Sequence, residues 1–374
     1  MVQSVLQFSG SEKITFLQEN VQPIQHGAEL LQKPLRLNLG LRNLGENINK
    51  NISRRQFIKA AGLTAGTTLM GCDICKAKNY KGKTRSFSTN TDFDVTFYAV
   101  ADTHFGRHQI AGDNELKNKQ AIDKMNYIPG NLSYPASAGG GLVDVPRGLI
   151  MPGDLTDFGT TSEWNGFSVF DGFKDNYCGN GTGRLNCPVY EGFGNHDFAA
   201  LHGTSDYVRE QVKIRNLTSA RPGISNISSN GYHYSFNWDT LHLVNLNLQP
   251  TGPGHAENSI EFLESDLQTN VGDTARAVIL YFHSDFDRED FWDEADEDVF
   301  YDIIEDYNVI AIFYGHAHVG SLVPGQWKGI NIYNVGLTGT GKFAVAHITN
   351  STMVVAECVS NTTWGVVSIK SITA

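Results

Sequence analysis

Five short apolar runs in this 374-residue chain each end in residues with carboxylate, amide or imidazole side chains. The β-branched and aromatic residues in these runs predict buried strands. Side chains that follow the carboxyl ends of strands in an α/β sheet gather at one edge. The chain must therefore fold so that five loops converge on one point. In order, the five segments are Asp102-Thr103-His104, Gly153-Asp154-Leu155-Thr156-Asp157, Gly194-Asn195-His196-Asp197, His283 and Gly315-His316-Ala317-His318.

Strand-like and helix-like patterns alternate along residues 93–374, and no linker interrupts them. We therefore expect one α/β domain with mixed sheets over this range. The alternation on both sides of Asp239-Thr240 predicts a hairpin. Strands are expected at 95–101, 148–151, 188–193, 232–238, 241–248, 277–282, 309–314 and over most of 329–372. Helices are expected at 115–127, 162–173, 205–217, 260–271 and 299–307.

The charge balance limits the partners that the protein can have. A formal net charge of -11, from 29 Lys+Arg and 40 Asp+Glu, argues against a protein that coats nucleic acid. Much of the acidity lies in residues 285–298, which we interpret as a solvated loop and the start of a helix. An anionic substrate would therefore have to be attracted by local metal charge rather than by the overall field.

Residues 53–72 resemble a twin-arginine export signal, because Arg54-Arg55 precede a mildly apolar region rich in Gly and Thr. The segment ends in Leu69-Met70-Gly71-Cys72, which resembles a bacterial lipobox whose cysteine is lipidated. We expect export to the periplasm or cell surface, with a membrane tether through Cys72 and residues 73–92. Residues 1–50 form an N-terminal extension, explained by a start assigned too far upstream or by a long leader. The alternative is an ordinary helix from Ser53 in a cytoplasmic enzyme.

Three cysteines lie in the expected domain. Cys178 and Cys187 bracket a loop rich in Gly and Asn, and the sequence leaves open whether they form a disulfide or remain thiols. Cys358 lies in an alternating strand pattern, which predicts a small core residue.

The side chains that follow the strands suit metal ions. A mixed set of Asp, Asn and His favours Mn, Fe, Co, Ni or Zn, whereas calcium prefers six to eight oxygen ligands. The spacing of Asp102 and His104 allows both to reach one ion. The carboxylate of Asp154 has two oxygens and can bridge two ions, while Asn195 adds a neutral oxygen that limits the negative charge. The sequence therefore predicts a paired-metal site.

The five segments together resemble the calcineurin-like metallophosphoesterase family, whose blocks are D-x-H, G-D-x-x-D, G-N-H-D, a lone His and G-H-x-H. The resemblance implies a sandwich of two mixed β-sheets flanked by helices, and a hydroxide between two ions that attacks phosphorus. It implies that His196 steadies the phosphoryl group and protonates the leaving oxygen, and that Asp197 orients His196. Asp157 is expected to fix its loop by hydrogen bonds rather than to bind metal. The implied ligands are Asp102, His104, Asp154 and His318 for one ion, and Asp154, Asn195, His283 and His316 for the other.

The expected activity is hydrolysis of phosphomonoesters or phosphodiesters by two divalent or borderline transition-metal ions. The substrate would be a small phosphorylated molecule such as a nucleotide, a cyclic nucleotide or a lipid headgroup. The alternative is a non-catalytic metal-binding lipoprotein that keeps the phosphoesterase fold.

Overall fold

The computed structural model describes residues 93–106, 114–169, 171–201, 203–218, 220–251, 259–286, 293–336 and 338–372. All of these belong to one of the two compact units of the chain, Met70–Ala374. The N-terminal extension, the export signal with Cys72 and the tether lie outside the described residues, so these interpretations and the domain boundary at residue 93 stay predictions. No helix among the described residues is both long enough and apolar enough to cross a membrane.

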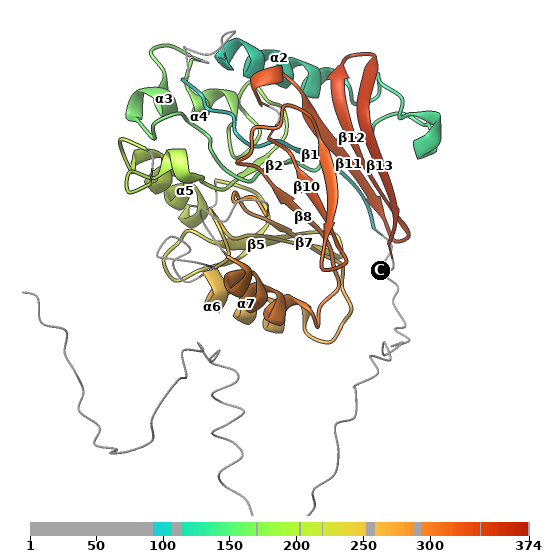
Figure 1. Cartoon of the computed structure of the whole chain (residues 1–374). Helices are drawn as coiled ribbons and strands as arrows, with labels where there is room; N and C mark the ends of the chain where they lie inside the picture. The colour runs from blue at the N-terminus through green and yellow to red at the C-terminus, as the bar shows by residue number, and fades with distance from the viewer. Residues whose placement is uncertain are drawn as a thin grey trace, which may run out of the picture. The chain divides into compact units, whose positions relative to one another are not determined.

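The first sheet has six strands in the order β13-β12-β11-β1-β2-β3 (Figure 1). Strands β1, β2 and β3 are parallel, whereas β11, β12 and β13 are antiparallel. The carboxyl ends of β1, β2 and β3 therefore meet at one edge. The strands are β1 (Asp94–Ala99), β2 (Leu149–Met151), β3 (Val189–Glu191), β11 (Phe343–Thr349), β12 (Thr352–Ser360) and β13 (Thr363–Ser371).

The second sheet has seven strands in the order β4-β5-β6-β7-β8-β10-β9. Strands β6, β7, β8 and β10 are parallel, and the other pairings are antiparallel. Both sheets are therefore mixed, as expected. The strands are β4 (Ile224–Ile227), β5 (Tyr234–Trp238), β6 (Leu241–Asn245), β7 (Val278–Tyr281), β8 (Val309–Tyr314), β9 (Val323–Trp327) and β10 (Ile330–Asn334).

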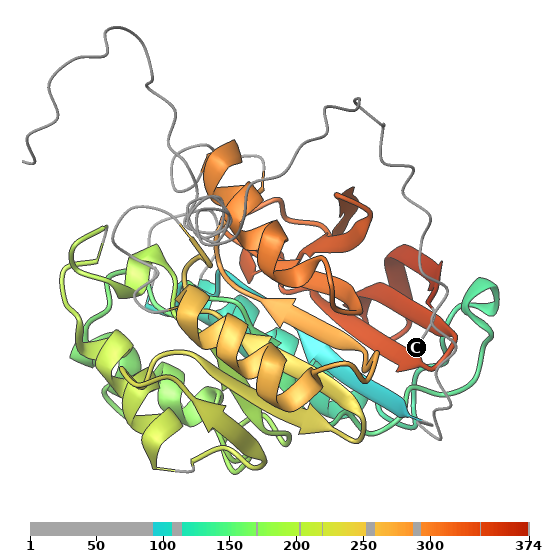
Figure 2. The same ribbon diagram turned by 90° about the horizontal axis from the view of Figure 1, so that it is seen from below.

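Three buried apolar clusters separate the layers. Along β1, Phe97 and Ala99 pack between the two sheets, while Tyr98 points to the opposite face. That outer cluster also contains side chains from α2 (Asn114–Tyr127), α3 (Thr161–Asn165), α4 (Phe173–Asn176) and α5 (Tyr207–Leu217). Helices α6 (Ser259–Asp266) and α7 (Glu294–Ile304) lie side by side over the second sheet, as Figure 2 shows in yellow and orange. The predicted sandwich of two mixed sheets flanked by helices is confirmed.

Most predicted elements are found with ends shifted by a few residues, including the hairpin of β5 and β6. The predicted helix at 162–173 is wrong, because α3 ends at Asn165 and Phe167 is 94% exposed. The chain reverses at Gly166, whose φ is 70° and where a Cβ would lie 2.3 Å from the backbone nitrogen of Gly172. Such a left-handed, crowded position is open to glycine and ends the helix.

The sequence left open whether Cys178 and Cys187 form a disulfide. Cys178 and Cys187 are both free in the structure. Cys358 is buried in β12, as its strand pattern predicts.

A buried ion network holds the end of β3. Glu191 is fully buried, and its carboxylate lies 2.9 Å from Nη1 of Arg215 and 3.0 Å from Nε of the buried Arg221. Burial alone would raise the pKa of Glu191, but the charges of Arg221 and Arg215 outweigh it and hold the pKa below its ordinary value. The network therefore fixes β3 and the chain after α5, next to the loop that carries Asn195.

Replacement of Glu191 by Gln should destabilise the fold by about 3–5 kcal/mol at neutral pH, because it leaves buried guanidinium charge without a partner. A lowered pKa stabilises the native state above the unfolded value near 4.5, and this contribution is lost as pH falls through the folded-state pKa. In urea unfolding, the difference in the free energy of unfolding between wild type and variant should become smaller below that pH. Asp123→Asn, which breaks an exposed pair with Arg184, should cost less than about 1 kcal/mol. Equal losses for both variants would contradict the role of Glu191.

Candidate metal centre

The five loops meet at the carboxyl ends of parallel strands from both sheets. The loops after β1 and β2 continue the pairing of their strands, since the backbone nitrogen of His104 donates to the carbonyl of Asp154 at 3.0 Å. The predicted convergence on one point is therefore observed. The residues brought together are Asp102 and His104 after β1, Asp154 after β2, Asn195 and His196 after β3, His283 after β7, and His316 and His318 after β8.

The backbone turns sharply at these ligand positions. Five of the described non-glycine residues with left-handed backbone belong to the site, with φ of 57° at Asp102, 38° at His104, 52° at Asp154, 70° at His316 and 48° at His318. Left-handed backbone costs roughly 1–2 kcal/mol per residue. Strain of this kind gathers where the surrounding structure fixes a functional geometry. Here the turns direct residues two apart in sequence toward the same point.

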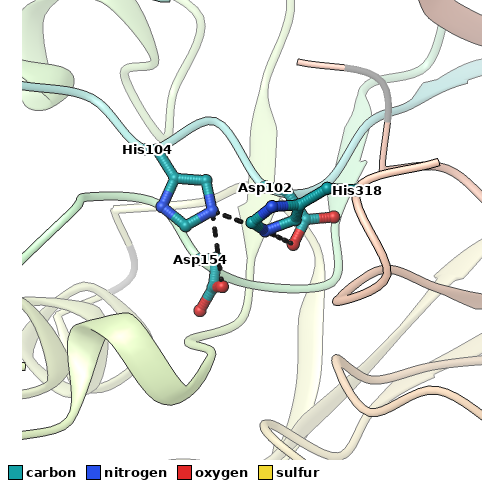
Figure 3. A group of neighbouring side chains, drawn as sticks. All are labelled: Asp102, His104, Asp154 and His318. Atoms are coloured by element: carbon teal, nitrogen blue, oxygen red, sulfur yellow. Dashed lines mark hydrogen bonds and ion pairs between the residues drawn. The ribbon is translucent and has the colours of Figure 1, made fainter. Parts of the chain in front are cut away.

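The first cluster contains Asp102, His104, Asp154 and His318, which Figure 3 shows pointing toward one another. Each offers one ligand atom, and these atoms lie within 4.8 Å of one another. The Nε2 atoms of His104 and His318 are 2.8 Å apart. Nε2 of His104 lies 3.6 Å from Asp154 Oδ2, and Nε2 of His318 lies 3.4 Å from Asp102 Oδ1.

The second cluster shares Asp154 with the first. Nε2 of His283 lies 3.2 Å from Asp154 Oδ2 and 3.0 Å from Asn195 Oδ1. Nδ1 of His316 lies 3.1 Å from the same Asn195 oxygen and 3.2 Å from Nε2 of His283. The carboxylate of Asp154 therefore stands between two sets of nitrogen and oxygen atoms.

The groups at the centre fit cations. Asp154 is fully buried, yet its Oδ2 atom accepts no hydrogen bond of good geometry from the described residues. Burial alone would raise the pKa of Asp154, but the neighbouring His283, His104 and His196 hold it well below its usual range. A buried carboxylate is costly unless a positive group compensates it. Two ions among these imidazole and oxygen atoms would supply that compensation, and the donor set suits borderline transition metals.

Asp157 was expected only to fix its loop, but it contacts two imidazoles of the site. Its Oδ1 atom is 3.3 Å from Nδ1 of His104 and 3.7 Å from Nδ1 of His196, and its carbonyl oxygen is 2.9 Å from Nδ1 of His196. Carboxylates that contact the far nitrogen of a metal-binding imidazole orient the ring. The sequence signal for this role was the G-D-x-x-D block, in which Asp157 follows Asp154 by three residues.

Asp197 has different partners from those expected. Its carboxylate accepts hydrogen bonds from the backbone nitrogens of Leu155, Thr156 and Gly194 and from the Thr156 hydroxyl. The tight turn at 195–197 directs Asp197 back toward the loop after β2, whereas His196 points toward Asp157. The expectation that Asp197 orients His196 is therefore corrected: Asp197 joins the two loops, and Asp157 contacts the imidazole. Burial and the charge of Asp154 raise the pKa of Asp197 to about 6.

Gly194 makes room for the shared carboxylate. Its φ of -110° suits any residue, but a Cβ there would lie 2.2 Å from Asp154 Oδ1. The backbone nitrogen of His196 donates to that same oxygen at 2.9 Å. A side chain at position 194 would therefore displace the carboxylate on which both clusters depend.

Gly194→Ala should weaken metal binding by at least about 10-fold while the chain stays folded, since only the local carboxylate must move. Isothermal titration with Mn²⁺ or Zn²⁺ measures this. The matched control is Gly329→Ala, which strains a left-handed turn at φ 86° but meets no neighbour within 4 Å. The control should lose some stability and keep its metal affinity. Unchanged affinity in Gly194→Ala would contradict the proposed geometry.

The solved structures that match this chain share little sequence with it. GAP50, the anchor in the inner membrane complex of Plasmodium, is 12% identical with a TM-score of 0.46, and the match covers 75% of this chain and 89% of that one. A predicted phosphoesterase from Streptococcus pneumoniae is 12% identical with a TM-score of 0.32, covering 75% and 98%. A cold-active protein-tyrosine phosphatase of Shewanella is 15% identical with a TM-score of 0.35, covering 75% and 80%. At these values the likenesses say nothing about activity. No curated protein matches the chain.

The family itself is established by sequence. The model of the calcineurin-like phosphoesterase family matches residues 95–320, which is more than half of the chain. That range contains both side-chain clusters, from Asp102 to His318. This chain therefore belongs to the calcineurin-like phosphoesterase family.

Proposed function

We propose that the protein is a dinuclear-metal phosphoesterase that hydrolyses phosphomonoesters or phosphodiesters. The observation that carries this proposal is the buried carboxylate of Asp154, which faces imidazole nitrogens from both clusters. Family membership supports the reaction class, because the matched range 95–320 contains both clusters.

The two ions would have separate ligand sets joined at Asp154. Bound ions would supply Lewis-acid polarisation of a phosphoryl oxygen and activation of a water molecule. The ligand types leave Mn, Fe, Co, Ni and Zn as candidates. The proposed ligands are Asp102, His104, Asp154 and His318 for the first ion, and Asp154, Asn195, His283 and His316 for the second.

The chain orients these ligands through contacts behind them. Asp157 faces Nδ1 of His104, which leaves Nε2 directed toward the first cluster. The carboxylate of Asp102 accepts the backbone N–H of His316 at 3.0 Å, so it ties a ligand loop of the first sheet to one of the second. The side chain of His318 is 42% exposed, while the other members of the first cluster are buried. Substrate would therefore approach from the side of His318.

His196 would act as the general acid. Its Nδ1 atom can donate to the carbonyl oxygen of Asp157, which leaves Nε2 directed toward the cluster, 3.9 Å from Asp154 Oδ2. Its partial exposure allows contact with a substrate. A proton held at Nε2 would be transferred to the leaving oxygen of the ester.

The proposed substrate is a small phosphorylated molecule such as a nucleotide, a cyclic nucleotide or a lipid headgroup. All three present the phosphoryl group on which the proposed ligands and His196 would act. The proposal includes export by the twin-arginine route with a lipid tether at Cys72, and this part rests on the sequence of residues 53–72.

Asp154→Asn should remove both ions of this dinuclear centre and lower phosphatase activity by more than about 100-fold, since loss of even a residue that orients a metal ligand costs 10- to 100-fold. Elemental analysis and hydrolysis of p-nitrophenyl phosphate test this. Asp239→Asn, which removes an exposed carboxylate paired with Arg147, is the control and should change neither quantity. Wild-type protein that binds two ions and hydrolyses no mono- or diester would instead support the non-catalytic alternative.

His196→Ala should slow esters with poor leaving groups by about 10²–10⁴-fold, because an alkoxide needs a proton as it leaves. The loss on p-nitrophenyl esters should be below about 10-fold, because p-nitrophenolate leaves without one. The ratio of kcat/KM values for alkyl and p-nitrophenyl esters measures the difference. Equal losses on the two esters would remove His196 from the acid role.

A further inference from the structure

A second group of metal-ligating side chains lies at the opposite end of β1 from the metal centre. Asp94 is the first residue of β1, whereas Asp102 follows its other end. Asp94, Asp144 and His347 each offer one ligand atom, and the three atoms lie within 4.8 Å of one another. The proposed reaction uses none of these residues, and Asp94 and His347 lie outside the range matched by the family.

The register of two strands brings the group together. Strands β1 and β11 are antiparallel, and Thr96 is paired directly with His347. Directly opposed residues project from the same face, and so does a residue two positions along the strand. Asp94, Thr96 and His347 therefore share one face, where His347 Nε2 lies 2.6 Å from Asp94 Oδ1. Asp144 reaches this face from the segment before β2.

Aromatic stacking fixes the imidazole of His347. The ring of Tyr134 lies nearly parallel to it, with 5.6 Å between centroids and 17° between planes. Trp364 stacks on Tyr134 at 5.6 Å and 12°, and its Nε1 donates to the carbonyl of Ser133 at 2.8 Å. The stacking therefore limits the orientations of the His347 ring.

Two neighbours of His347, its strand partner Thr96 and the stacked Tyr134, carry buried hydroxyls. Thr96 is 3% exposed and Tyr134 is 5% exposed. Their hydroxyls lie against each other, but neither makes a hydrogen bond of good geometry to the described residues. Burial raises the pKa of the Tyr134 hydroxyl well above its ordinary value. Buried hydroxyls that lack such bonds point to a missing partner.

We propose that Asp94, Asp144 and His347 bind one divalent cation of the zinc type. Carboxylate oxygen and imidazole nitrogen are ligand types that such ions accept, and water would complete the coordination. The ion would fasten the beginning of β1 to β11 and to the segment that carries Asp144. It would be a structural ion, separate from the two ions of the proposed reaction. The competing interpretation is a simple ion pair between a protonated His347 and Asp94.

Metal counting on the full-length protein tests the site with Zn²⁺ as the probe. Metal-free wild type should bind three ions per chain and Asp144→Asn/His347→Gln two, with hydrolysis of p-nitrophenyl phosphate unchanged. In the Asp154→Asn background, one ion should remain and should vanish when the double substitution is added. Zn²⁺ should raise the Tm of Asp154→Asn by about 5 °C and leave the triple variant unchanged. Asp123→Asn, a matched loss of one exposed carboxylate, should keep all three ions.

The proposal is overturned if the double variant binds as many ions as wild type. It is also overturned if Zn²⁺ raises the Tm of Asp154→Asn and the Tm of the triple variant to the same extent. In that case the contact between Asp94 and His347 is an ion pair only. Circular dichroism checks that the variants fold, and Asp144→Asn alone provides the test if the double variant does not. Because the measurement is binding, an inactive wild type would refute the proposed function without affecting this result.

Discussion

The fully buried carboxylate of Asp154 is the constraint on which the rest of the site depends. Its position requires nearby positive charge, because an isolated carboxylate in a protein interior is strongly disfavoured. The fold surrounds the carboxylate with imidazoles from loops of both sheets, which would hold the compensating ions, and Gly194 leaves room for the approach. Directing so many polar groups at one carboxylate requires left-handed backbone at several site residues, which is a strained conformation.

Assembly of the centre is therefore tied to closure of the sandwich. His104 comes from a loop of the first sheet, and His283 and His316 come from loops of the second. Neither sheet alone holds a complete set around Asp154. The apolar cluster between the sheets, which contains Phe97 and many other buried side chains, supplies the energy that brings the two halves together at about 25 cal/mol per Å² of apolar surface buried. Metal binding would add to the stability of the closed state.

Strand periodicity and the polar residues after each strand are local signals, and they predicted an α/β domain with mixed sheets and the convergence of the five loops. The two-sheet sandwich was implied by the resemblance to the phosphoesterase family. The resemblance implied that Asp197 orients His196, whereas the structure brings Asp157 to the imidazole. Asp157 and Asp197 are both plausible by spacing, and the choice depends on backbone dihedrals in the tight turn at 195–197. The helix expected at 162–173 failed for a similar reason. The apolar spacing was helical, but the close approach of Gly166 to Gly172 ended α3 and left Phe167 in solvent.

The left-handed backbone at the ligand positions also limits how such a centre can decay during evolution. Glycine, asparagine and aspartate tolerate these dihedrals, whereas valine, isoleucine and threonine do not. In a related protein that no longer needed metal, substitutions at positions such as Asp102 and His316 would therefore favour glycine or asparagine. Asparagine or glycine at those positions would indicate a protein that has lost metal binding and kept the fold.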